Sequence, residues 1–77
     1  MPREPRTTDI VAEMAASVLS IAVAPGDSLA AGDTVVLLES MKMEIPVLTD
    51  AAGTVTAVRV AEGDAVQEGD VLVSLEL

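Results

Sequence analysis

The stretch VLSIAVAPGDSLAAGDTVVLLE, residues 18–39, recurs in altered form as VTAVRVAEGDAVQEGDVLVSLE, residues 55–76. A shift of 37 positions aligns the two without a gap, and ten of the 22 aligned residues are identical. Both Gly-Asp dipeptides of the first copy, at 26–27 and 32–33, fall on Gly-Asp dipeptides of the second. Chance alignment of Ala- and Val-rich sequence would not readily reproduce both, so the chain contains an internal duplication.

Each copy has the pattern of short β-strands separated by turns. The second copy opens with Val-x-x-Val-x-Val, whose β-branched residues suit a pleated, half-buried surface. It closes with Val71, Val73 and Leu75 at every second position, which is typical of a strand. The Gly-Asp dipeptides indicate turns, because Gly supplies positive φ and Asp bonds its own backbone. They lack the spacing and the closing Glu of a calcium-binding EF-hand loop.

Residues 9–20 are an exception, because their composition alone favours a helix. The duplication overrides that preference, since it maps residues 17–21 onto 54–58, which resemble a strand. We therefore predict an all-β fold: a flattened antiparallel β-sandwich (barrel-sandwich hybrid) of about eight short strands from two quasi-symmetric repeats. Residues 40–46 connect the copies, and the symmetry places this hairpin at the pole opposite the chain ends.

The composition fits one small domain and excludes several classes of function. Four basic and thirteen acidic residues give a formal charge of −9, so nucleic acids and anionic membrane surfaces would repel the domain. The absence of Cys and His excludes disulfides, Cys/His zinc sites and Cys–His or Ser–His catalytic pairs. No acid–base pair or phosphate-binding loop is evident either. We therefore predict that the protein is not an enzyme and has no catalytic or metal-binding residues.

The N-terminal residues differ in character from the repeat. Residues 1–8 are polar and contain Pro2 and Pro5, so we expect a short disordered lead before a domain that spans residues 9–77. No stretch reaches the roughly 18 apolar residues of a membrane span, and no apolar signal core follows the N-terminus. We therefore expect a cytoplasmic protein without membrane partners, monomeric as an isolated domain.

Lys42 lies at the junction of the two copies, between Met41 and Met43. A tight turn there would expose all three side chains, so the methionines would offer soft, adaptable contacts instead of filling the core. A nucleophilic lysine needs burial or a cationic neighbour, whereas Glu39 and Glu44 favour the charged ammonium form. Lys42 is therefore better suited to be a substrate that another enzyme acylates than to be a catalyst.

The run Glu39-Ser40-Met41-Lys42-Met43-Glu44 resembles the biotin-attachment signature of the biotinyl domain family, usually Glu-Ala-Met-Lys-Met. Residues 12–18 (AEMAASV) resemble the family's Ala-Pro-Met-Pro-Gly-Thr-Val, and residues 51–55 (AAGTV) resemble its Gly-x-Val element. The Gly-Asp turns and the duplication also match, so the resemblance covers about residues 9–77. Ser40 departs from the usual Ala, and the chain lacks the protruding thumb of some bacterial acetyl-CoA carboxylase carriers.

The resemblance implies that a biotin protein ligase attaches biotin covalently to Lys42. The flanking recognition residues would be Met41 and Met43, and the hairpin context would be Glu39, Ser40 and Glu44. A biotin carboxylase subunit would then carboxylate the biotin, using ATP and bicarbonate, and the arm would carry the carboxyl group to a carboxyltransferase subunit. The expected setting is an acyl-CoA carboxylase of fatty acid biosynthesis, with this chain as the carrier.

Two alternatives remain open. A lipoyl domain shares the fold and presents a lysine at the same turn, but its signature usually reads Asp-Lys-Ala, so Met41 and Met43 favour biotin. A cofactor-free adaptor, as in the barrel-sandwich hybrid segments of membrane-fusion proteins, normally lies within long helical chains, for which 77 residues leave no room.

Overall fold

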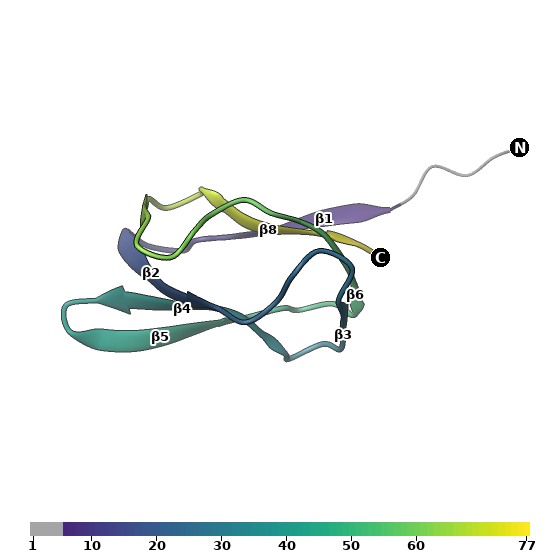
Figure 1. The fold of residues 1–77 in the computed structure, drawn as a ribbon, viewed down its shortest axis with the longest axis horizontal. Coiled ribbons are helices and arrows are strands. Elements are labelled where there is room, and N and C mark those ends of the chain that lie inside the picture. The colour runs from purple at the N-terminus through teal and green to yellow at the C-terminus, as the bar shows by residue number, and fades with distance from the viewer. Residues whose placement is uncertain (1–5) are drawn as a thin grey trace, which may run out of the picture.

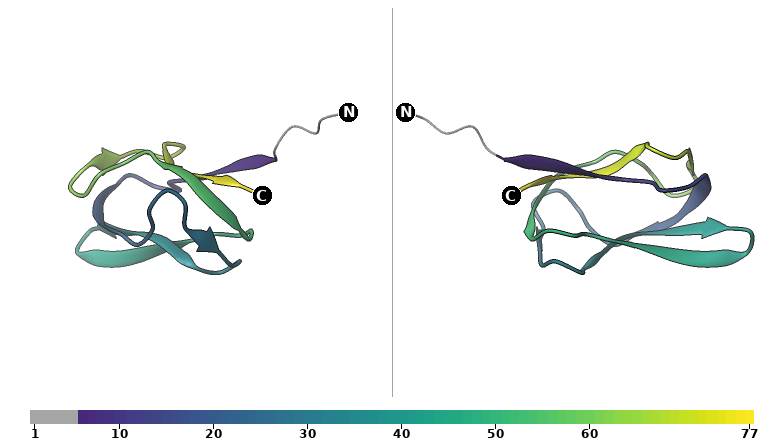
Figure 2. Two further views of the ribbon diagram at one scale, coloured as in Figure 1. Left: turned by 45° about the vertical axis from the view of Figure 1, so that its right-hand side comes forward. Right: turned by 180° about the vertical axis from the view of Figure 1, so that it is seen from behind.

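A computed structural model describes residues 6–77, which form two antiparallel four-stranded sheets. The strands are β1 (Thr7–Val11), β2 (Ala16–Ile21), β3 (Ser28–Leu29), β4 (Thr34–Ser40), β5 (Met43–Leu48), β6 (Gly53–Val58), β7 (Ala65–Val66) and β8 (Val71–Glu76). The strand orders are β1-β8-β6-β3 and β5-β4-β2-β7. Figures 1 and 2 show the sheets facing each other as a flattened sandwich. With no helix in the described residues, the predicted all-β sandwich is confirmed.

The duplication relates the two sheets, each of which contains strands from both sequence copies. A shift of 37 residues superposes β2, β3 and β4 on β6, β7 and β8. The same shift places β1 on β5, because the Thr7↔Glu76 partners of β1 and β8 correspond to the Glu44↔Glu39 partners of β5 and β4. The register irregularities also fall at equivalent places in the two sheets. The duplication therefore includes the outer strands, whose residues gave no sign of it in the sequence.

The core consists of equivalent side chains from the two copies. Leu38 and its equivalent Leu75 are 1% and 0% exposed, and Val36 and Val73 are both fully buried. Each Val or Leu buried in this way contributes about 1.5–3 kcal/mol. The helix-favouring segment follows the same logic. Residues 9–11 belong to β1 and residues 16–20 to β2. Val18 gains a place in the core, and β2 pairs with both β4 and β7.

The Gly-Asp dipeptides form the predicted turns. In each turn the Asp carboxylate accepts a hydrogen bond, 2.9 Å long, from the backbone N–H three residues earlier. The glycine before each Asp has a positive φ, for example 95° at Gly26 and 90° at Gly63. Most residues other than glycine are strained in that region, so the repeated Gly-Asp pairs follow from the repeated turns.

The first strand begins earlier than the sequence suggested. Thr7 and Thr8, expected in the disordered lead of residues 1–8, belong to β1 and pair with Glu76 and Leu75 of β8. Pairing with β8 satisfies the backbone groups of these two threonines, and this long-range contact is invisible in a polar sequence. Residues 1–5 of the expected lead lie outside the described part of the chain.

The connecting hairpin and the C-terminus lie at opposite ends of the sandwich (Figure 1). The hairpin joins β4 to β5, and Ser40 and Met43 are Cα partners at its tip. At the other pole the equivalent residues are Leu77 and Arg6, whose backbone N–H and C=O form a 2.7 Å hydrogen bond. The pole opposite the hairpin is thus an equivalent strand pair without its connecting turn, as the symmetry argument predicted.

Candidate functional site

The tip of the β4–β5 hairpin is a two-residue turn made of Met41 and Lys42. β4 ends at Ser40 and β5 begins at Met43, so the hairpin is tighter than the expected 40–46 connection. Met41 has φ 52° and Lys42 has φ 65°, the only positive values among the described non-glycine residues. Two-residue hairpins favour this mirror-image turn because it matches the strand twist, but they usually use Asn-Gly. A left-handed conformation costs about 1–2 kcal/mol for each ordinary residue.

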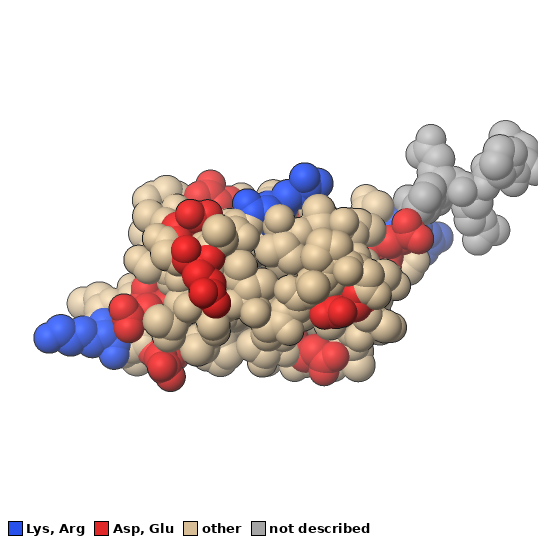
Figure 3. Space-filling view, in the orientation of Figure 1, with Lys and Arg blue, Asp and Glu red and all other residues tan. Residues whose placement is uncertain are grey.

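The side chains of the turn project into solvent. Met41 is 91% exposed, Met43 is 65% exposed, and Lys42 is exposed between them. Lys42 is also the only lysine of the chain. Figure 3 shows a basic projection at the end of the molecule where the hairpin lies. The expectation that neither methionine fills the core is therefore confirmed.

Two carboxylates lie opposite each other on the hairpin, one residue pair away from its tip. Glu39 of β4 and Glu44 of β5 are Cα partners, and both are exposed. Like charges directly opposite on a sheet destabilise it, and the equivalent position of the other copy pairs Glu76 with Thr7 instead. The hairpin thus combines a strained turn with a like-charge pair. Both features are unfavourable for folding alone and fit a surface shaped by recognition.

All six predicted site residues, Glu39 to Glu44, lie together in this hairpin. Ser40, where the resembling signature usually has Ala, is half-buried. The hairpin is a projecting tip, so the Lys42 side chain is accessible from outside the sandwich. Within residues 6–77 we find no group of three or more His, Cys, Asp or Glu side chains placed to hold a metal ion. Nor does this part of the chain include a helix long and apolar enough to cross a membrane.

One surface feature was missed by the sequence analysis. A cavity of about 380 Å³ lies between β1 and β5. Leu38 and Ile45 of the hairpin line it, but none of residues 39–44 does. Its lining includes Glu13 and Asp50, which occupy equivalent positions of the two copies. In the sequence, only the 37-residue spacing of these two carboxylates related them to each other. It had no meaning until β1 and β5 were known to lie on the same side of the sandwich.

Comparison with known protein families identifies the chain. Residues 3–75 match the family described as "Biotin-requiring enzyme". The match spans more than half of the sequence, and the chain belongs to this family.

Curated relatives and solved structures agree with this assignment. The "Biotinylated protein TB7.3 homolog" of Mycolicibacterium smegmatis and "Biotinylated protein TB7.3" of Mycobacterium tuberculosis are each 65% identical over 40 residues. That match covers 52% of this chain and 56% of either relative, about half their length. A single-chain, multi-domain long-chain acyl-CoA carboxylase is 28% identical with a TM-score of 0.87, covering 99% of this chain and 8% of that one. The urea carboxylase of Kluyveromyces lactis is 27% identical with a TM-score of 0.86, covering 97% and 7%.

Proposed function

We propose that this protein is a biotin carboxyl carrier and that a biotin protein ligase attaches biotin to the Nζ atom of Lys42. The observation that supports this most is the position of Lys42. It is the only lysine of a chain in a biotin-requiring family, and it lies at the tip of a hairpin between two exposed methionines. The two solved structures compared above are both carboxylases.

The hairpin suits an acyl transfer carried out by another enzyme. The turn carries Lys42 to the exposed tip of the hairpin, so a ligase can reach the amine by contacting the end of the sandwich. The ligase must remove a proton from the ammonium group, and the neutral amine then attacks the activated carboxyl carbon of biotin. A C–N amide bond forms and the activating group leaves. The product has lost one positive charge, which leaves three basic against thirteen acidic residues and a formal charge of −10.

Biotin would carry the carboxyl group on a ureido nitrogen, and the protein would move this group between active sites. A carrier must leave each active site after every step, so tight docking would slow turnover. A small module with a flexible arm instead provides a high effective concentration at each site without a large interface. We assign the carboxylation and transfer steps to partner biotin carboxylase and carboxyltransferase subunits. We propose a cytoplasmic acyl-CoA carboxylase of fatty acid biosynthesis as the setting, and the likeness to a long-chain acyl-CoA carboxylase supports the acyl-CoA part of this proposal.

We assign recognition of the hairpin to the residues that flank Lys42. Met41 and Met43 would contact the ligase and carboxylase active sites through polarisable thioethers that adapt to different surfaces. Glu39 and Glu44 would give the hairpin a paired negative charge for a basic surface on a partner, and half-buried Ser40 would anchor the end of β4. A lipoyl carrier remains the second candidate, because its lysine occupies the same turn, but the two methionines favour biotin.

Ligation in vitro tests this proposal. The wild-type chain and its Lys42→Arg variant are incubated with a biotin protein ligase, ATP and biotin, and their intact masses are measured. We expect one biotinyl increment on the wild type and none on the variant. A parallel reaction with a lipoate ligase and lipoate should leave both masses unchanged. A lipoyl increment in place of a biotinyl one would support the second candidate instead.

A further inference from the structure

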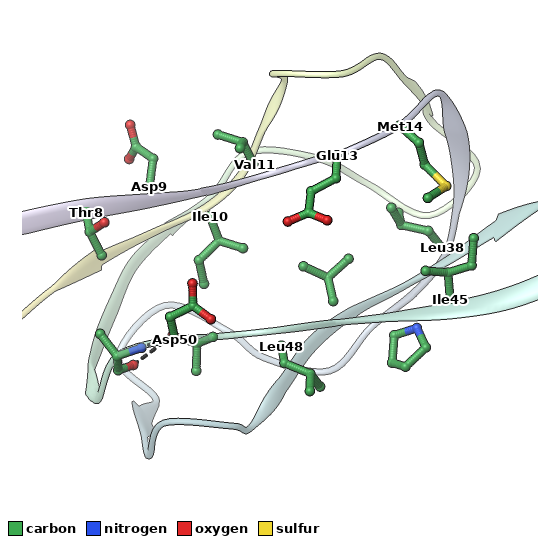
Figure 4. Close-up of a pocket in the computed structure, with 14 residues that line it drawn as sticks. Thr8, Asp9, Ile10, Val11, Glu13, Met14, Leu38, Ile45, Leu48 and Asp50 are labelled. Carbon is green, nitrogen blue, oxygen red and sulfur yellow. Dashed lines mark hydrogen bonds between the residues drawn. The ribbon is translucent and has the colours of Figure 1, made fainter.

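A groove runs between the outer strands of the two sheets, and none of residues 39–44 around the Lys42 turn lines it. β1 and β5 are each hydrogen-bonded to only one neighbouring strand. Both line the cavity of about 380 Å³, which Figure 4 shows between them. On the opposite side, β3 lies between β2 and β4 in the chain but belongs to the other sheet, and β7 likewise lies between β6 and β8. The chain therefore crosses between the two sheets on that side. The sandwich is therefore open along β1 and β5.

The walls of the groove are partly apolar and partly polar, and they are related by the internal symmetry. Ile10 of β1 and Val47 of β5 are equivalent residues that both line it, and both pack against the core. Their neighbours Val11 and Leu48 are 40% and 49% exposed. Met14, which is 40% exposed, adds a further apolar side chain. Figure 4 shows Val11 and Leu48 directed away from the opening, so the apolar surface of the groove comes from Ile10, Val47 and Met14. Apolar side chains left accessible in a concave surface are typical of an interaction site.

The charges of the groove are all negative. Figure 4 shows the carboxylates of Glu13 and Asp50 directed into the opening between β1 and β5. Asp9 borders the groove, but its carboxylate points away from the opening and accepts a 2.9 Å hydrogen bond from the Ser74 hydroxyl. No Lys or Arg belongs to the lining. A second copy of this chain would present the same acidic surface and a charge of −9, so self-association here is electrostatically unfavourable. The charge instead complements a basic side chain, whose aliphatic stem would contact Ile10 and Val47.

The backbone of β1 offers a template for an added strand. Because Arg6 and Leu77 form a hydrogen-bonded pair, antiparallel alternation turns the N–H and C=O groups of Thr7, Asp9 and Val11 away from β8. At the equivalent edge of β5, Pro46 replaces Asp9 and removes one N–H donor. A partner strand can therefore pair along β1 more completely than along β5.

We propose that this groove binds an extended segment of a partner protein, which pairs with β1 and places a basic side chain between Glu13 and Asp50. Alternate residues of a strand face the same side, so the segment carries apolar residues two positions before and two positions after the basic one. A partner held in this way grips the body of the domain and leaves the Lys42 hairpin free to move between active sites. The docking does not require biotin on Lys42.

A peptide titration tests the proposal on the complete, unmodified chain. The probe is the acetylated and amidated peptide Thr-Val-Thr-Arg-Thr-Val-Thr, added to ¹⁵N-labelled protein and followed by NMR. We expect saturable shift changes confined to the amides of β1, β5, Glu13 and Asp50, and the same affinity for the Lys42→Arg variant. A peptide with Gln in place of Arg should bind about tenfold more weakly, as expected for two exposed ion pairs near the upper end of their usual range.

Charge-matched variants separate the groove from the overall acidity. Glu13→Gln combined with Asp50→Asn should weaken binding about tenfold. Glu62→Gln combined with Glu68→Gln changes the net charge equally at exposed loop positions outside the groove and should change binding no more than about twofold. Equal losses in both double variants would refute the proposal, as would shift changes centred on β3 or β7 or an absence of binding. If the protein alone sediments as a dimer and the β1 amides shift with protein concentration, the occupant of the groove is a second copy of this chain and the proposal is overturned.

Discussion

Replacing the strained turn should stabilise the fold at the expense of the proposed attachment site. Met41 and Lys42 both have left-handed backbone conformations, at about 1–2 kcal/mol each. In the variant Met41→Asn/Lys42→Gly, Asn tolerates this region and Gly adopts it freely. The extra entropy of Gly in the unfolded chain offsets about 0.5–1 kcal/mol of the gain. We therefore expect a net stabilisation of about 1–2 kcal/mol, which raises Tm by roughly 5–15 °C for a domain of this size.

The assay is thermal unfolding followed by far-UV circular dichroism, because the chain has no aromatic residue to report by fluorescence. Met41→Asn alone should give about half of the gain and keep the lysine. Met43→Asn is the matched control, since Met43 is exposed but lies in β5 outside the positive-φ turn, and it should not stabilise the fold. A double variant that unfolds at or below the wild-type Tm would refute the idea that the turn is strained.

Four further substitutions test the hairpin and its symmetry-related pole. Lys42→Arg should abolish streptavidin binding of protein produced with a biotin ligase and change the unfolding free energy by less than about 0.5 kcal/mol, because the side chain is exposed; persistent binding would place the biotin elsewhere. Met41→Leu and Met43→Leu should each preserve the fold but lower kcat/KM for the ligase, and unchanged rates would show that the methionines are incidental. Gly53→Ala should destabilise the domain by about 2 kcal/mol or more in urea unfolding, since its Cβ would lie 2.6 Å from the backbone oxygen of Glu76; a wild-type midpoint would contradict this packing.

The inner strands of the fold could be predicted because the duplication records them directly. Identical residues such as Val18 and Val55, or Leu38 and Leu75, occupy equivalent core positions and therefore remained alike. The outer strands could not be matched in this way. β1 and β5 carry Asp and Pro at the equivalent positions 9 and 46, where Asp9 pairs with Ser74 and accepts its hydroxyl hydrogen bond but Pro46 pairs with Leu37. The two strands share the backbone register and not the side chains.

The candidate site shows the same division. Its location and exposure could be predicted, because Lys42 lies at the junction of two copies that must connect at one pole. The conformation of the turn could not, since Met-Lys is not a sequence that favours positive φ at both residues. The groove could not be predicted either, because it forms between β1 and β5, which are far apart in the sequence and lie on the same side of the sandwich.

The most direct measurement of the proposed role is tandem mass spectrometry of the protein purified from its native source. We predict a single biotinyl group on the Nζ atom of Lys42, in fragments that also contain Met41 and Met43. A lysine found entirely unmodified, or one that carries a lipoyl group, would contradict the proposal that this hairpin presents biotin to the partner enzymes.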